Sequence, residues 1–152
     1  MAQFSFIPSG EARELADDVR ELFEDLAARL PPEQRAQSGE CHPTIDVLET
    51  DEAVEVVVDV SGIPPAALRV LFRAGVLLVA GEKAPPRAPE NHTFHLVERE
   101  FGRFARAVRL TGAFSVGTAR ASLDDGELTI VLPKLVDRRD QSHRIPVTPG
   151  QA

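Results

Sequence analysis

The stretch of sequence that decides the fold is Ala121-Ser122-Leu123-Asp124-Asp125-Gly126-Glu127-Leu128-Thr129-Ile130-Val131-Leu132-Pro133-Lys134. Apolar residues alternate with polar ones on both sides of the Asp-Gly pair, with the period of two that a β-strand requires. An Asp-Gly pair between two such runs predicts a hairpin turn, because glycine adopts a positive φ without steric cost. Pro133 has no N–H to donate and ends the second strand.

Length and charge limit what the rest of the chain can be. Its 152 residues, 43% of them hydrophobic, fit one domain with extensions. The net charge of −7 argues against a nucleic-acid-binding protein, which normally carries a basic face. A single cysteine, Cys41, cannot form an intramolecular disulfide, and the first residues do not resemble a signal peptide. We therefore expect a cytoplasmic protein, and one without a membrane span, since no apolar stretch reaches about 20 residues.

Residues 1–41 are expected to form an N-terminal arm with one amphipathic helix over residues 10–30. Ser9 is a suitable N-cap, and Pro31-Pro32 end the helix. Its apolar residues recur at i, i+3, i+4 and i+7, and its other face carries more acidic than basic residues. This charge argues against an anionic membrane surface and favours packing against another protein helix. The apolar residues of the arm are Phe4, Phe6, Ile7, Leu15, Val19, Leu22, Phe23 and Leu26.

Residues 42–134 change from a helical period to a period of two, and they predict an all-β sandwich. Besides the hairpin, the expected strands are residues 44–48, 53–60, 68–73, 76–80, 93–100 and 104–110. The segment between the fourth and fifth of these, residues 84–92, contains Pro85, Pro86 and Pro89 and has no periodicity. It is expected to leave the sheet as a long loop.

Residues 135–152 form a polar extension that holds one apolar tripeptide, Ile145-Pro146-Val147. Pro146 restricts Ile145 to extended conformations, so both apolar side chains project to the same side. A peptide of this shape can dock on a sheet edge or in a groove, with alternate side chains in pockets.

No pattern of residues indicates catalysis or metal binding. The four histidines lie in different segments without the spacing of a metal site, and Cys41 has no nearby group that would activate it, so an exposed thiol in a linker is expected. The carboxylate pairs Asp51-Glu52 and Asp124-Asp125 stand where turns need them. We therefore expect neither an enzyme nor a bound cofactor or metal.

Four motifs together resemble the small heat-shock proteins, the α-crystallin-domain family, of bacterial and plant type. They are Ala121 to Lys134, Val70 to Lys83, Leu96 to Arg106, and Ile145-Pro146-Val147. They cover about residues 42 to 147. Two positions depart from the family pattern: Thr111 replaces the usual proline, and Ala107 stands where a second basic or bulky residue is common.

The resemblance implies an immunoglobulin-like β-sandwich that dimerises through a strand carried on the long loop, here Glu82 to Thr93. Arg106 matches the interface arginine of the family, although its sequence context alone also allows an exposed edge-strand charge. Ile145 and Val147 match tail residues that enter a groove on a neighbouring dimer. By position the expected walls of that groove are Val56, Val58 and Val60 together with the strand of Ala121 and Leu123.

The resemblance also implies the function. The arm from Phe4 to Leu30 matches the part that contacts unfolding client proteins, and homodimers assemble into larger homo-oligomers. The expected activity is that of an ATP-independent holdase chaperone, which binds partly unfolded proteins and suppresses their aggregation under heat or other stress. Two alternatives remain: a β-sandwich adaptor or co-chaperone that docks on one folded partner, and a carbohydrate binder, which is disfavoured because the chain has no Trp or Tyr for stacking.

Overall fold

The hairpin forms as expected and lies within a four-stranded sheet. We describe a computed structural model, which places residues 9–36, 38–136, 142, 144–147 and 149. The hairpin strands pair with Leu123 opposite Leu128. In the turn, both Asp125 (φ 48°) and Gly126 (φ 80°) have positive φ, which suits a tight hairpin. A Cβ at Gly126 would lie 3.1 Å from the Cα of Ser61, so the close approach of this loop also favours glycine.

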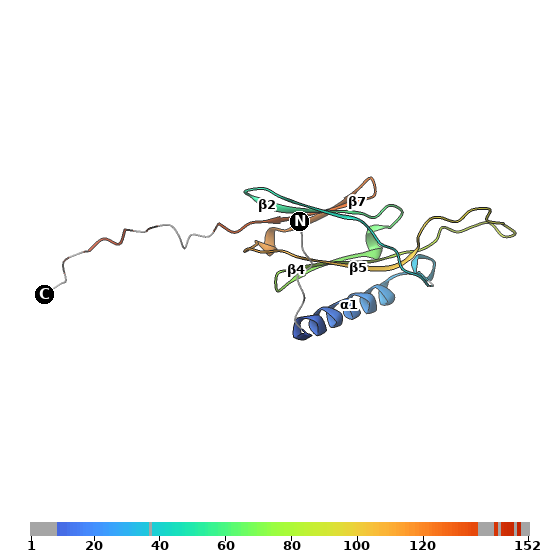
Figure 1. The fold of residues 1–152 in the computed structure, drawn as a ribbon, viewed down its shortest axis with the longest axis horizontal. Coiled ribbons are helices and arrows are strands. Elements are labelled where there is room, and N and C mark those ends of the chain that lie inside the picture. The colour runs from blue at the N-terminus through green and yellow to red at the C-terminus, as the bar shows by residue number, and fades with distance from the viewer. Residues whose placement is uncertain (1–8, 37, 137–141, 143, 148, 150–152) are drawn as a thin grey trace.

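Two antiparallel sheets, of strand order β1-β2-β7-β6 and β3-β4-β5, stack face to face, and a helix lies outside the second sheet (Figure 1). The helical elements are α1 (Ser9–Arg29), η1 (Pro32–Gln34), η2 (Pro65–Ala67) and η3 (Val116–Thr118). The strands are β1 (Ile45–Glu49), β2 (Ala53–Asp59), β3 (Leu68–Arg73), β4 (Val76–Lys83), β5 (Gly102–Arg109), β6 (Arg120–Asp124) and β7 (Glu127–Pro133). The predicted all-β sandwich is confirmed.

The core lies between the two sheets and follows the period of two. On β2 and β7 every second side chain is buried, including Val56 and Val58 on β2 and Ile130 on β7. Leu77 and Val79 of β4 enter the same cluster from the opposite sheet. Burial of these aliphatic side chains, each contributing about 1.5–3 kcal/mol, is the main force that holds the sheets together.

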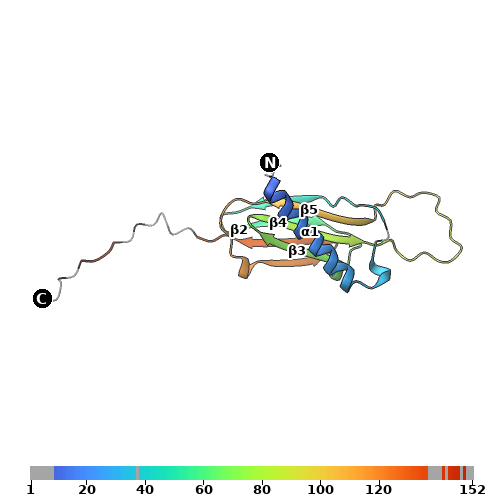
Figure 2. The same cartoon turned by 90° about the horizontal axis from the view of Figure 1, so that it is seen from below.

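The expected strand over residues 93–100 is wrong for the single subunit. Residues 84–101 contain no strand, and they extend beyond the sandwich as a long loop (Figure 2). The loop is exposed from Pro85 to Glu100. Alternation alone does not form a strand, because the N–H and C=O groups need a neighbouring strand, and none of the described strands pairs with this segment. Conversely, β4 runs further than expected and includes Glu82 and Lys83, so the loop begins at Ala84.

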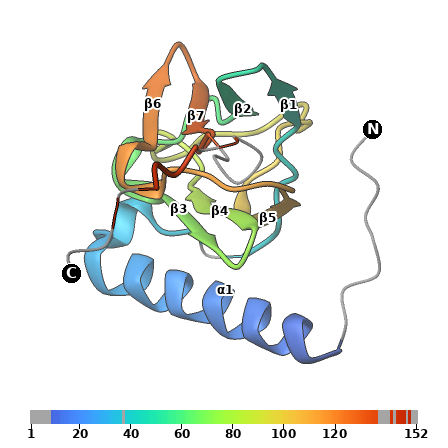
Figure 3. The same ribbon diagram turned by 90° about the vertical axis from the view of Figure 1, so that its left-hand side faces the viewer.

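Helix α1 packs across the outer face of the sheet β3-β4-β5 (Figure 3). Leu26, with no exposed surface, and Leu30 at 2% are buried there. The helix thus packs on a β-sheet of its own chain, whereas the sequence favoured packing against another protein helix. Within the described residues, no helix has the length and apolar character that a membrane crossing requires.

Candidate functional site: exposed apolar segments around the sandwich

The tripeptide of the C-terminal extension is fully accessible. Ile145 is 83% exposed and Val147 is 96% exposed. Residues 144–147 have no regular secondary structure. In this subunit both aliphatic side chains therefore remain available to a surface of another molecule.

The expected walls of the tail groove are wrong in one half. Val56, Val58 and Val60 are at most 1% exposed and belong to the core between the sheets, so they leave no surface for a peptide. In addition, β7 separates β2 from β6. The alternation of β2 predicts correctly that the three valines share a face, but it does not say whether that face meets a groove or the opposite sheet.

The other half of the expected groove is a free sheet edge. Strand β6 pairs only with β7, and on it Ala121 is exposed and Leu123 is half-buried against the core. Strand β3 is an edge of the other sheet and lies on the same side of the sandwich as β6 (Figure 3). Val70 of β3 is 37% exposed. The edges of β3 and β6 thus place apolar side chains where none of the seven described strands covers them.

Arg106 lies on β5, the other edge of the second sheet. It is opposite Val79, a core residue, so it is on the strand face that looks toward the first sheet. Its Nη1 donates a hydrogen bond to the carbonyl oxygen of Pro43 at 2.7 Å, and the residue is half-buried. The guanidinium is therefore held in place at the sandwich edge, unlike a freely exposed charge.

The long loop presents three exposed apolar side chains close together in the sequence. Phe94 is 67% exposed and Leu96 is 74% exposed, with Val97 beside them. Val47 and Leu48 on β1 are also exposed, and β1 has one unpaired edge. Exposed apolar groups of this size on a folded domain mark surfaces that other protein segments cover.

The apolar stripe of the arm is partly covered. Four apolar side chains of α1 are half-buried: Leu15, Val19, Leu22 and Phe23. A fifth, Leu26, is completely buried. Phe4, Phe6 and Ile7 lie outside the described residues.

The thiol of Cys41 is buried, which corrects the expectation of an exposed linker cysteine. It donates to the carbonyl oxygen of Gly102 at 3.4 Å. Burial raises the pKa of the Cys41 thiol, so the thiolate that reacts with oxidants or electrophiles is disfavoured. Across the part of the chain that the structure describes, no three His, Cys, Asp or Glu side chains gather in a way that could hold a metal ion.

The burial of Glu82 was not predicted from the sequence. Glu82 is 1% exposed; its Oε1 accepts from Arg103 Nε at 2.9 Å and its Oε2 accepts from the Ala36 backbone N–H at 3.0 Å. These contacts of Glu82 join β4 to β5 and to the part of the arm that follows α1. A Glu at the end of an alternating strand carries no sequence signal of burial, because strand ends usually reach solvent.

Comparison with known proteins agrees with this geometry. The model of the Hsp20/alpha crystallin family matches residues 46–148. The chain is 30% identical over 119 residues to heat shock protein 16 of Schizosaccharomyces pombe, covering 77% of this chain and 83% of that protein. It is 32% identical over 132 residues to the 16.9 kDa class I heat shock protein 1 of Triticum aestivum, covering 86% and 87%.

Solved structures show the same fold. Heat shock protein 16.0 from Schizosaccharomyces pombe superposes with a TM-score of 0.61 at 28% identity, over 72% of this chain and all of that one. A small heat-shock protein from Xylella fastidiosa, whose crystal structure is described as a distinct high order structure, gives 0.58 at 26% identity, over 73% and 98%. The sandwich, the matched motifs and these relatives place the chain in the Hsp20/alpha crystallin family, whose members are ATP-independent chaperones of the stress response and not enzymes.

Proposed function

We propose that this protein is a holdase, which binds partly unfolded proteins through exposed apolar segments and keeps them from aggregating. The observation that carries the proposal is the exposure of Phe94, Leu96, Ile145 and Val147 on a subunit that is otherwise acidic and well packed. A folded domain with so much accessible apolar surface associates with other chains. Which chains it meets, other copies of itself or unfolding clients, depends on their concentrations.

The loop of residues 84–101 is proposed to join two subunits. The loop pairs with no strand among the residues that the structure describes, and β1 offers an unpaired edge with Val47 and Leu48 beside it. Addition of a loop segment to the β1 edge of a second copy would satisfy the backbone groups of both. Arg106, held at the edge of β5 by Pro43, is proposed to lie in this dimer interface and to pair with acidic groups of the second copy.

The tail is proposed to join dimers into larger homo-oligomers. Ile145 and Val147 have the spacing that places alternate side chains of an extended peptide in neighbouring pockets. The receiving surface is proposed to be the gap between the β3 and β6 edges, with Val70, Ala121 and Leu123 at its sides. This assignment replaces the three core valines with residues whose side chains are accessible.

The energies fit an assembly that opens under stress. Burial of one aliphatic tail side chain contributes about 1.5–3 kcal/mol, so a single tail detaches readily. Many tails acting together hold the assembly because each bound tail raises the effective concentration of the next. Heating increases detachment and also the population of unfolded clients, which then meet the exposed arms. The arm, with Phe4, Phe6 and α1, is proposed as the main client-binding segment.

A light-scattering assay on a heat-denatured model enzyme, without ATP and beside a size measurement, tests the proposal. The holdase predicts suppression of scattering and a large complex that contains the client. The runner-up is an adaptor that docks on one folded partner. It predicts a small particle of fixed size and no suppression. The cytoplasmic location stays a prediction.

A further inference from the structure

The outer face of the sheet β3-β4-β5 has the composition of a docking surface. Because Leu77 and Val79 enter the core, their neighbours Leu78 and Ala80 face outward, yet they are buried at 2% and 0% beneath α1. The register places Leu71 opposite Leu78 and Ala107 on its other side, so an apolar row crosses all three strands. Below we call this outer face, with Arg69, Arg73 and Arg103 at its margins, the cradle.

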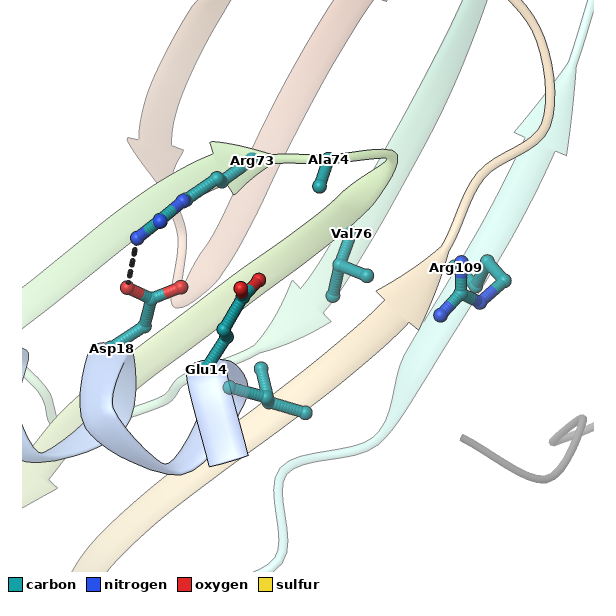
Figure 4. A pocket seen from close by; sticks show the side chains of 7 residues that line it. Glu14, Asp18, Arg73, Ala74, Val76 and Arg109 are labelled. Atoms are coloured by element: carbon teal, nitrogen blue, oxygen red, sulfur yellow. Dashed lines mark hydrogen bonds and ion pairs between the residues drawn. The ribbon is translucent and has the colours of Figure 1, made fainter. Parts of the chain in front are cut away.

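The arginines at the margin of the cradle hold the helix. Arg69 Nε donates to Asp25 Oδ2 at 2.7 Å, and Arg73 Nη1 donates to Asp18 Oδ1 at 2.8 Å. Figure 4 shows the second pair, with Asp18 on α1 directed at Arg73, the last residue of β3. Apolar contact in the middle and charge at the margin define where a helix can dock and in which direction.

The spacing of the two partners matches. Asp18 and Asp25 are seven residues apart on a helix, a rise of about 10.5 Å, and lie on one face. Arg69 and Arg73 are four residues apart on a strand, a rise of about 13 Å, and also lie on one face. Asp18 pairs with Arg73, and Asp25 pairs with Arg69. The order along the helix is therefore the reverse of that along the strand, so α1 runs antiparallel to β3.

At the β5 margin of the cradle, Arg103 contacts the C-terminal half of α1. The guanidinium of Arg103 stacks over the Phe23 ring with 5.2 Å between the guanidinium carbon and the ring centroid, while its Nε is bonded to the buried Glu82. Leu26 and Leu30 are buried close by. The N-terminal half is less tightly packed: a cavity of about 40 Å³ there is lined by Glu14 and Leu15 of α1 and by Val76 of β4, among others (Figure 4).

One small side chain of β5 borders the apolar row of the cradle. Ala107 lies opposite Leu78 and is half-buried, whereas Ala105, opposite Ala80, is exposed. Ala107 is one of the two departures from the family pattern given above, and a longer side chain at this position would crowd the space beside Leu78.

We propose that α1 binds the cradle reversibly. In the resting subunit the cradle covers the apolar stripe of the arm, and release of α1 from the cradle makes this stripe accessible to clients. The proposal rests on the holdase function proposed above. Release is feasible because both ion pairs lie at the margin and are only partly buried: the Arg73 and Asp18 side chains are 59% and 12% exposed, and those of Arg69 and Asp25 are 22% and 33% exposed. Salt screens pairs that reach solvent, and this weakens the contact at Arg73 most. Undocking uncovers two apolar surfaces at once, the stripe on α1 and the row around Leu78.

Charge reversal with rescue tests the dock. The open variant is Asp18→Arg with Asp25→Arg; the rescue adds Arg69→Asp and Arg73→Asp, which restores opposite charges in the exchanged order. The matched control, Glu21→Arg with Glu24→Arg, makes the same charge change on exposed positions of the same helix. Hydrogen exchange of the full-length protein follows α1 and the β-strands separately. A client unfolded by disulfide reduction, without heating, reports aggregation.

The dock predicts at least roughly tenfold faster exchange of α1 amides in the open variant, with unchanged β-strands, and recovery in the rescue but not in the control. It also predicts stronger client protection by the open variant at low temperature. Unchanged exchange of α1 amides in the open variant would show that these ion pairs do not hold α1 on the cradle. Faster exchange without stronger protection would overturn its role in covering the arm. If the wild type protects no client at any temperature, the holdase proposal fails, while the exchange data still decide whether the helix is docked.

Discussion

Asp25 Oδ2 of α1 lies 2.7 Å from Arg69 Nε of β3 and joins the N-terminal arm to the outer face of the sandwich. Asp25 Oδ1 lies at the same distance from Arg29 Nε, one turn later on the helix. One carboxylate therefore bridges a helix and a sheet. This contact and its counterpart between Asp18 and Arg73 place the arm on the domain, whereas the sequence indicates only that the arm has an apolar face.

The pH dependence of this contact has a defined sign. The hydrogen bond from Arg69 holds the pKa of Asp25 below its usual value of 3.8, helped by the charges of Arg29 and Arg69 and opposed by partial burial. A lowered pKa in the docked state stabilises docking above about pH 4, and this contribution is lost as the pH falls through the docked-state pKa. We expect α1 exchange to be independent of pH between about 5 and 8, after correction for intrinsic exchange. Asp25→Asn should speed it at neutral pH, and equal exchange in that variant and the wild type would contradict the assignment.

Ala107→Arg should displace α1. The new side chain would stand on the cradle beside Leu78, which α1 covers, and overpacking of a buried surface typically costs about 1–3 kcal/mol. Hydrogen exchange should show an unprotected α1 above an intact sandwich. Ala113→Arg, at an exposed position away from the cradle, is the control and should leave α1 protected. If α1 amides in Ala107→Arg exchanged as slowly as in the wild type, binding of the helix would not require a small residue at this position.

The tail residues and the core valines should behave differently. Ile145→Ala with Val147→Ala should shrink assemblies toward dimers without changing the stability of the subunit, because both side chains are exposed in it. Val58→Ala should instead lower the free energy of unfolding by about 2 kcal/mol, since it leaves a cavity in the core. Sedimentation and chemical denaturation separate the two effects. A particle of unchanged size after the tail substitutions would refute the role of the tail.

Arg106→Ala should weaken the dimer and loosen the segment before β1. It removes the hydrogen bond to Pro43 and, under the proposed interface, a pairing with acidic groups of the second copy. We expect a rise in the dimer dissociation constant of about tenfold or more, measured by sedimentation in the tail-substituted background, where dimers are the largest species. Arg109→Ala on the same strand is the comparison. Equal dissociation constants for wild type and Arg106→Ala would place Arg106 outside the interface.

The apolar stripe of α1 should be needed for client binding itself. Leu15→Ser with Leu22→Ser should lower client protection even though it also loosens the helix, because serine offers little apolar area. Ala16→Ser with Ala28→Ser, at exposed positions of the same helix, should leave protection unchanged. Light scattering with a reduced client measures both. Protection that survives loss of the stripe would move client binding to the sandwich or to the loop.

Local pattern predicted those parts of the fold that local physics determines. The Asp125-Gly126 turn, the period of two along β2 and β7, and the helix after Ser9 follow from turn chemistry and periodicity. The strand expected over residues 93–100 did not form, because a strand also needs a neighbour, and the described part of the single chain supplies none. Periodicity likewise grouped Val56, Val58 and Val60 on one face but could not identify the surface opposite that face.

The contacts between α1 and the cradle were beyond prediction for the same reason. Asp18 and Arg73 are 55 residues apart in the sequence, and each is an ordinary surface residue type. Only the stacking of the helix on β3-β4-β5 brings them together. Glu82 is similar, since its burial depends on Arg103 and on the backbone of Ala36, which arrive from different segments. The departure at Ala107 was visible in the sequence, but its meaning became clear only with the helix in place.

The holdase proposal is decided by the aggregation of a heat-denatured model enzyme, followed by light scattering without ATP while the particle size is recorded. We expect the wild-type protein to suppress scattering and the client to be recovered in a large complex with it. Scattering equal to that of the client alone, with the protein remaining as a particle of fixed size, would refute the holdase.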